Sequence, residues 1–89
     1  MSKRVAIITG AAGGMGQAFT RALLNDGVCV AGFDIAQDAL DAMSSELGTD
    51  FLGIRVDLTD PEAVKDAFDQ VASAFGGLDI LVNNAGTCF

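Results

Sequence analysis

The sequence predicts an α/β fold in which crossover helices cover a parallel sheet. Four short apolar runs alternate with three segments of helical spacing, glycines end the helical segments, and 51% of the 89 residues are hydrophobic. Strands that alternate with helices are typical of a doubly wound sheet. Because crossover connections are right-handed, we expect strand order 3-2-1-4, with the first two helices on one face and the third on the other.

The first strand and the first helix are predicted between Val5 and Gly27. Residues Val5 to Thr9 form a largely β-branched run that ends before a glycine, which is typical of a strand buried on both faces. Helical spacing begins at Gly14, and Gly27 provides the stop. The apolar stripe expected for this helix is Met15, Ala18, Phe19, Ala22 and Leu23.

Three further strands and a shorter helix follow in the same alternation. The strands are expected at residues 28–33, 51–56 and 80–82, each an apolar run that stops at an acid or an amide. The shorter helix ends at Gly48 and is marked by Leu40, Met43 and Leu47.

The third helix carries the clearest end signals. Asp60 is a suitable cap, Pro61 suits the first helical position, Glu62 complements the helix dipole, and Gly76 follows the last apolar residue. Its expected apolar face is Val64, Ala67, Phe68, Val71, Ala72 and Phe75. The large side chains expected in the core are Met15, Phe19, Phe68 and Phe75.

Composition limits the function classes. A chain of 89 residues allows one domain with a small core, and a net charge of −7 disfavours nucleic acid and anionic membranes as partners. The two cysteines, Cys29 and Cys88, form no paired motif, and no targeting segment is evident, so we expect a cytoplasmic protein. Histidine and tyrosine are absent, so neither a histidine-based catalytic or metal site nor a phenolic acid or base is expected.

The loop between the first strand and the first helix, Thr9 to Gly16, contains four glycines and two alanines. Such a loop lies at the amino end of a helix, where N–H groups and the helix dipole attract anions. Gly10, Gly14 and Gly16 would let a pyrophosphate approach the backbone, although a tight turn without a ligand also needs glycine. Because no lysine follows the glycines, a Walker-type triphosphate site is not expected.

Polar residues follow the other three strands. Asp34 ends the second strand 18 residues after Gly16 (34 − 16), a spacing close to that of an acid that accepts from an adenosine ribose. The same residue could equally be a polar strand end. Asp57 is either a turn and cap residue or part of a cofactor rim, and Asn83-Asn84 form either a local turn or a hydrogen-bonding rim.

Three signatures together resemble those of the short-chain dehydrogenase/reductase family: Thr9-Gly10-x-x-x-Gly14-x-Gly16, Asp57-Leu58 and Asn83-Asn84-Ala85-Gly86. They occur in the family's order and span nearly the whole chain. The resemblance implies an incomplete Rossmann-type domain over residues 1–89, in which these segments and the acid after the second strand hold a nicotinamide dinucleotide. The implied cofactor residues are Gly10, Ala12, Gly13, Gly14, Met15, Gly16, Asp34, Ile35, Asp57, Leu58, Asn84, Ala85 and Gly86.

The resemblance also indicates which dinucleotide is preferred. Relatives that use NADP place a basic residue in the glycine loop or just after the second strand, where this chain has Gly13 and Ile35. The carboxylate of Asp34 would repel a 2′-phosphate and accept from a 2′-hydroxyl. NAD is therefore favoured over NADP.

The catalytic residues of the family are a further asparagine, a serine and a Tyr-x-x-x-Lys pair, all downstream of the Asn-Asn-Ala-Gly segment. This chain has no tyrosine, and neither Lys3 nor Lys65 lies in such a motif. We expect the amino-terminal cofactor-binding half of an oxidoreductase that transfers hydride between nicotinamide and a carbonyl or alcohol, without catalysis by this chain alone. The alternative is a non-catalytic dinucleotide-binding or assembly module.

The fourth strand is expected to have a bare edge, because Ile80, Leu81 and Val82 would have no neighbour on one side. We therefore expect self-association of the chain, or pairing with the missing half through this strand.

Overall fold

The computed structural model describes residues 3–85 and contains the predicted succession of elements. Each strand differs from its predicted range by at most one residue at either end. The elements are β1 (Val5–Thr9), α1 (Gly14–Asn25), β2 (Cys29–Asp34), α2 (Gln37–Leu47), β3 (Phe51–Arg55), α3 (Pro61–Phe75) and β4 (Ile80–Asn83).

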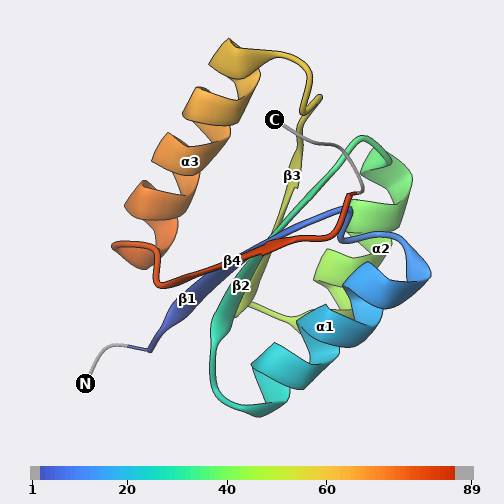
Figure 1. The fold of residues 1–89 in the computed structure, drawn as a ribbon. Coiled ribbons are helices and arrows are strands. Elements are labelled where there is room, and N and C mark those ends of the chain that lie inside the picture. The colour runs from blue at the N-terminus through green and yellow to red at the C-terminus, as the bar shows by residue number, and fades with distance from the viewer. Residues whose placement is uncertain (1–2, 86–89) are drawn as a thin grey trace.

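The four strands form one parallel sheet in the order β3-β2-β1-β4, as predicted. Figure 1 shows α1 and α2 on one face of the sheet and α3 on the other, which confirms the placement expected from right-handed crossovers. Because all strands run in the same direction, their carboxyl ends meet at one edge of the sheet. That edge is where the loops after β1, β2, β3 and β4 come together.

The core consists of one apolar cluster on each face of the sheet. All five residues of β1 are buried, and alternate ones point to opposite faces: Ile7 packs in the cluster on the α3 face, and Ile8 in the cluster on the α1 and α2 face. The two rings of Phe33 and Phe68 meet edge to face, with centroids 5.8 Å apart. Because β1 and β2 are buried on both faces, they form the centre of the sheet, and the loops project from their ends.

The end signals of α3 are present in the structure. The Oδ1 atom of Asp60 accepts hydrogen bonds from the backbone N–H groups of Glu62 and Ala63, at 3.1 and 3.3 Å. Gly76 ends the helix in the left-handed region, with φ = +86°. Phe68 and Phe75 are half-buried against the core cluster on this face, so the prediction that they pack in the core is confirmed in part.

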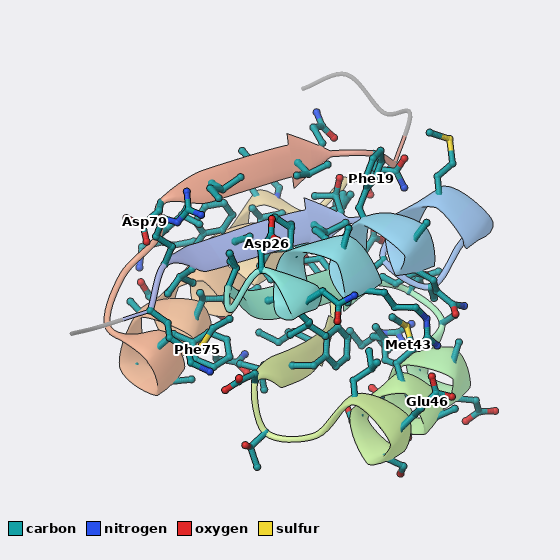
Figure 2. All side chains as sticks on the ribbon, turned by 90° about the horizontal axis from the view of Figure 1, so that it is seen from below. Phe19, Asp26, Met43, Glu46, Phe75 and Asp79 are labelled. Carbon is teal, nitrogen blue, oxygen red and sulfur yellow. The ribbon has the colours of Figure 1, made fainter. Side chains whose placement is uncertain are left out.

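α1 packs against the sheet through only part of the predicted apolar stripe, because Leu23 is half-buried against the core cluster but the earlier members of the stripe are not. Gly16 and Thr20 are buried, whereas the side chains of Met15 and Phe19 are 65% and 38% exposed. Ala18 and Ala22 are also exposed, and Figure 2 shows Phe19 on the side of α1 that is next to β4. The prediction that Met15 and Phe19 are core residues is therefore wrong.

The close approach of α1 to the end of β1 explains this difference. A Cβ atom on Gly16 would lie 2.1 Å from the carbonyl oxygen of Gly10, so no side chain fits there. Thr20, one turn later, satisfies its buried hydroxyl by donating to the carbonyl oxygen of Gly16 at 2.8 Å. Met15 and Phe19, in the first two turns of the helix, are consequently turned away from the sheet, whereas Leu23 and Leu24 further along pack against the core cluster on this face.

The described part of the chain, residues 3–85, contains no helix that combines the length and the apolar character needed to span a membrane.

Candidate functional site

A cavity of about 320 Å³ lies where the strands end, between the loops that follow β1, β2, β3 and β4. Its wall combines apolar side chains with two carboxylates. The lining residues are Gly10, Phe33, Asp34, Ile35, Val56, Asp57, Leu58, Thr59 and Ala85.

Two glycines of the loop are required by the packing of the protein itself. Gly10 has φ = +66°, and a Cβ atom there would lie 3.1 Å from the Cα atom of Ala85. A Cβ atom on Gly16 would lie 2.7 Å from the Cα atom of Ala11, in addition to its clash with Gly10. These two positions need glycine because β1, α1 and the segment after β4 approach each other closely.

Gly13 and Gly14 have no such requirement. Among residues 3–85, a Cβ atom on Gly13 would meet its nearest atom at 3.6 Å, which is an ordinary contact, and one on Gly14 would have no atom within 4 Å. Both residues have negative φ, and at Gly14, which opens α1, alanine could adopt the same backbone and would be favoured by about 0.4–1 kcal/mol. As the cap residue, Gly13 also offers no side chain to the first N–H groups of the helix. Bare backbone is thus presented at the amino end of α1 without a packing reason.

The carboxylate of Asp34 connects the end of β2 to the glycine loop. Its Oδ2 atom accepts a hydrogen bond from the backbone N–H of Ala12, and its Oδ1 atom accepts one from the backbone N–H of Ala36, both at 3.0 Å. Each carboxylate oxygen has two acceptor positions, so both atoms can take a further donor. Asp34 is therefore oriented by the backbone and keeps acceptor capacity at the cavity that it lines.

A second side chain, that of Gln17, forms a hydrogen bond with the same loop residue, Ala12. Gln17, half-buried in the first turn of α1, donates from Nε2 to the carbonyl oxygen of Ala12 at 2.9 Å. Both polar backbone groups of Ala12 are thus bonded by side chains, one from Asp34 and one from Gln17.

Asp57 closes the turn after β3. Its Oδ1 atom accepts from the hydroxyl of Thr59 at 2.7 Å and from the backbone N–H of Thr59 at 2.9 Å. These hydrogen bonds, that of the hydroxyl first, hold the pKa of the Asp57 carboxyl below its usual value. Asp57 also lines the cavity, so the turn role and the rim position that the sequence left as alternatives coexist in one residue.

The hydroxyl of Thr9 ties the end of β1 to the segment after β4. Thr9 is only 4% exposed, and its Oγ1 atom accepts from the backbone N–H groups of Asn84 and Ala85 at 2.9 and 3.2 Å. The same hydroxyl lies 3.0 Å from Oδ1 of Asn83, to which it donates. The side chain of Asn84 adds a bond to the carbonyl oxygen of Gly10 at 3.4 Å. The two asparagines therefore join neighbouring strand ends beside the glycine loop.

The structure brings most of the predicted cofactor residues to this edge of the sheet. Gly10, Asp34, Ile35, Asp57, Leu58 and Ala85 line the cavity, and Asn84 and Ala12 are hydrogen-bonded to residues that line it. Met15 stands exposed on the first turn of α1, and Gly86 lies outside the described residues.

Sequence reasoning assigned no role to the side chains of Thr9 and Gln17. The partners of Thr9 are 73 to 76 residues away, and no local spacing reports such a contact. Gln17 carried no recognised signal either, because a capping box places its glutamine at the third helical residue, here Gly16, and uses it as an acceptor, whereas Gln17 donates.

The arrangement suits a ligand with three chemically different parts. The bare amino end of α1 favours an anionic group, the carboxylate of Asp34 favours a hydroxyl donor, and the apolar wall at Val56 and Leu58 favours a flat ring.

Comparisons with a family model and with known proteins agree with the family resemblance of the sequence. The family model described as short chain dehydrogenase matches residues 4–88. Serine 3-dehydrogenase from Rhizobium radiobacter is 44% identical over 80 residues, covering 90% of this chain and 32% of that protein. The Escherichia coli K12 3-oxoacyl-[acyl-carrier-protein] reductase FabG is 35% identical over 83 residues, covering 93% of this chain and 34% of the reductase. The chain thus spans about a third of the length of these relatives.

A solved structure has a similar fold. The crystal structure of 3-ketoacyl-(acyl-carrier-protein) reductase from Brucella melitensis, complexed with NADH, superposes with a TM-score of 0.86 at 29% identity. The match covers 90% of this chain and 33% of the reductase.

Proposed function

Because the chain belongs to the short-chain dehydrogenase family, we propose that the edge formed by its strand ends binds NAD(H), as the cofactor-binding part of an oxidoreductase. The bound nicotinamide would supply hydride exchange with a carbonyl or alcohol carbon. The bare backbone at Gly13 and Gly14 carries the proposal, since packing does not require glycine there and a pyrophosphate against the helix start does. A turn without a ligand would need only Gly10 and Gly16.

Each part of the cofactor has a set of residues to hold it. The amino end of α1 would bind the pyrophosphate, Asp34 the adenosine ribose, and the apolar wall of the cavity the adenine. The NADH in the Brucella melitensis reductase supports a nicotinamide dinucleotide as the ligand. The residues proposed to form the site are Gly10, Ala12, Gly13, Gly14, Met15, Gly16, Asp34, Ile35, Asp57, Leu58, Asn84, Ala85 and Gly86.

NAD is proposed over NADP because a carboxylate stands where a 2′-phosphate would need a cation. Asp34 is held toward the loop by the backbone N–H of Ala12 and is also bonded by that of Ala36, and neither Ile35 nor Gly13 carries a charge. A phosphate close to this carboxylate would meet like-charge repulsion at short range, whereas a ribose hydroxyl can donate to it.

We expect the chain to bind NAD about tenfold or more tightly than NADP in titration calorimetry. Asp34→Asn keeps the size of the side chain and one acceptor oxygen but removes the charge. This variant should lose affinity for NAD by about tenfold, because hydrogen bonds to charged groups are the stronger ones, and should bind the two cofactors almost equally.

Asp69→Asn is the matched control, since it removes the same charge from an exposed position on α3. Its affinities should equal those of the unchanged chain. Equal binding of NAD and NADP by the unchanged chain would defeat the cofactor assignment.

The 89-residue chain is proposed not to transfer hydride by itself. It contains no tyrosine and no histidine, and neither lysine lies in a Tyr-x-x-x-Lys pair. The second candidate function is a non-catalytic dinucleotide-binding or assembly module, which would use the same cofactor site. The cytoplasmic location expected from the sequence stays a prediction.

Self-association through β4 is proposed for the purified chain. β4 is an edge strand of the sheet, and the side chain of Leu81 is 54% exposed although its neighbour Ile7 on β1 is fully buried. An edge strand with an exposed apolar residue can pair with another chain, and a second copy is the partner available in solution. In the whole protein, pairing of β4 with the remaining part of the molecule is the alternative.

We expect sedimentation velocity to show dimers or larger species for the unchanged chain and mostly monomer for Leu81→Lys, because charge on an edge strand opposes pairing. Ser45→Lys adds the same charge at an exposed position of α2 and should leave the association unchanged. A compact monomer formed by the unchanged chain would contradict this proposal.

A further inference from the structure

The peptide groups on both sides of Ala12 are held by side chains from two different elements. Asp34, at the end of β2, accepts from the N–H of Ala12 at 3.0 Å, and Gln17, on α1, donates to its carbonyl oxygen at 2.9 Å. We call these two side chains the Ala12 clamp. Backbone hydrogen bonds also restrain the loop: the N–H of Ala11 donates to the carbonyl oxygen of Phe33 at 3.1 Å, that of Gly13 to Gly10 at 3.2 Å, and that of Gln17 to Gly13 at 2.9 Å. The two side chains are what hold the peptides of Ala12.

The clamp acts next to the part of the loop that is most exposed and least restrained by packing. Gly13 and Gly14 directly follow Ala12, are exposed, and even with a Cβ atom added would meet no atom of residues 3–85 closer than 3.6 Å. Glycine has more accessible backbone conformations than any other residue, so a ligand that orders such a segment loses affinity to the entropy cost. Fixing the adjacent peptide in the free protein reduces that cost.

We propose that Gln17 is a positioning residue for the cofactor. Its side-chain amide, acting with Asp34, holds the Ala12 peptide so that the bare backbone of Gly13 and Gly14 is in place before the pyrophosphate arrives. This inference rests on the proposed function for its ligand, whereas the effect on the loop exists without any ligand. Gln17 is needed as a donor, because the group it meets is a carbonyl oxygen.

The test uses two variants of the full chain. Gln17→Ala removes the side chain, and Gln17→Glu keeps its shape but places a carboxylate, which cannot donate, beside the carbonyl oxygen of Ala12. In the free protein, amide hydrogen exchange of Ala12 and Gly13, followed by NMR, should become about two- to tenfold faster in both variants. The affinity for NAD should fall by a similar factor, and that for adenosine, which has no pyrophosphate, should stay the same.

Gln70→Ala and Gln70→Glu are the matched controls, because Gln70 is an exposed glutamine on α3. These variants should exchange and bind like the unchanged chain. Wild-type exchange in Gln17→Glu would overturn the donor role, and faster exchange with an unchanged NAD affinity would overturn the positioning role. Failure of the unchanged chain to bind NAD would overturn the proposed function, while faster exchange in the Gln17 variants would still support the clamp.

Discussion

Gly14→Ala is expected to stabilise the chain by about 0.5–1 kcal/mol and to weaken its binding of NAD by about tenfold or more. Gly14 is the first residue of α1, its φ is negative, and a Cβ atom there would meet no atom of the described residues within 4 Å. Alanine therefore gains helix propensity without a clash. The added methyl group would occupy space that we assign to the pyrophosphate, so stability and binding should change in opposite directions.

Gly16→Ala should behave differently although it lies only two residues further along the helix. Its Cβ atom would lie 2.1 Å from the carbonyl oxygen of Gly10 and 2.7 Å from the Cα atom of Ala11, and backbone atoms cannot move aside cheaply. We expect a loss of about 3 kcal/mol or more in the free energy of unfolding, together with the loss of NAD binding.

Urea unfolding followed by circular dichroism, together with calorimetric titration of NAD, separates these outcomes. Gly77→Ala is the matched control, because Gly77 has open space for a Cβ atom and lies in the connection between α3 and β4, away from the glycine loop. It should leave NAD affinity unchanged. If Gly14→Ala bound NAD as tightly as the unchanged chain, the glycines of the loop would need an explanation other than a ligand.

The sequence predicted the elements well because their signals are local. β-branched runs, the cap at Asp60 and the glycine stops act within a few residues, and the handedness of crossovers then determines the strand order. The burial of Met15 and Phe19 on α1 was predicted wrongly because apolar spacing does not report how closely a helix approaches a strand. Here the close approach of Gly16 to Gly10 decides which side of α1 is buried, and Met15 and Phe19 stay exposed.

For the candidate site, too, features with local sequence signals could be predicted, whereas features that depend on tertiary contacts could not. Glycine spacing and strand-end acids located the loop, Asp34 and Asp57 at the edge where the structure places them. The distinction between Gly14 and Gly16 could not be made from the sequence, because it depends on which backbone atoms lie opposite each Cα atom. The hydrogen bonds of Thr9 could not be predicted from the sequence either, since they join segments more than 70 residues apart.

Thr9→Val is expected to destabilise the chain by about 2–3 kcal/mol and to weaken NAD binding. Valine has nearly the shape of threonine but no hydroxyl, so the N–H groups of Asn84 and Ala85 would lose their acceptor in a part-buried place. Each unsatisfied buried group costs about 1–3 kcal/mol, although partial exposure lets water replace some of the loss. The segment after β4 should then loosen beside Gly10, where we place part of the cofactor.

Thr9→Ser separates the hydroxyl from the methyl group of threonine. Serine keeps the donor and the acceptor and should cost only about 1 kcal/mol, the typical effect of losing one buried methyl. Urea unfolding and NAD titration of the two variants test this, with amide exchange at Asn84 and Ala85 as a local measure. If Thr9→Val were no less stable than Thr9→Ser, the methyl group rather than the hydroxyl would be what joins β1 to the segment after β4. The bonds of Oγ1 would then have no energetic role in holding that segment beside the glycine loop.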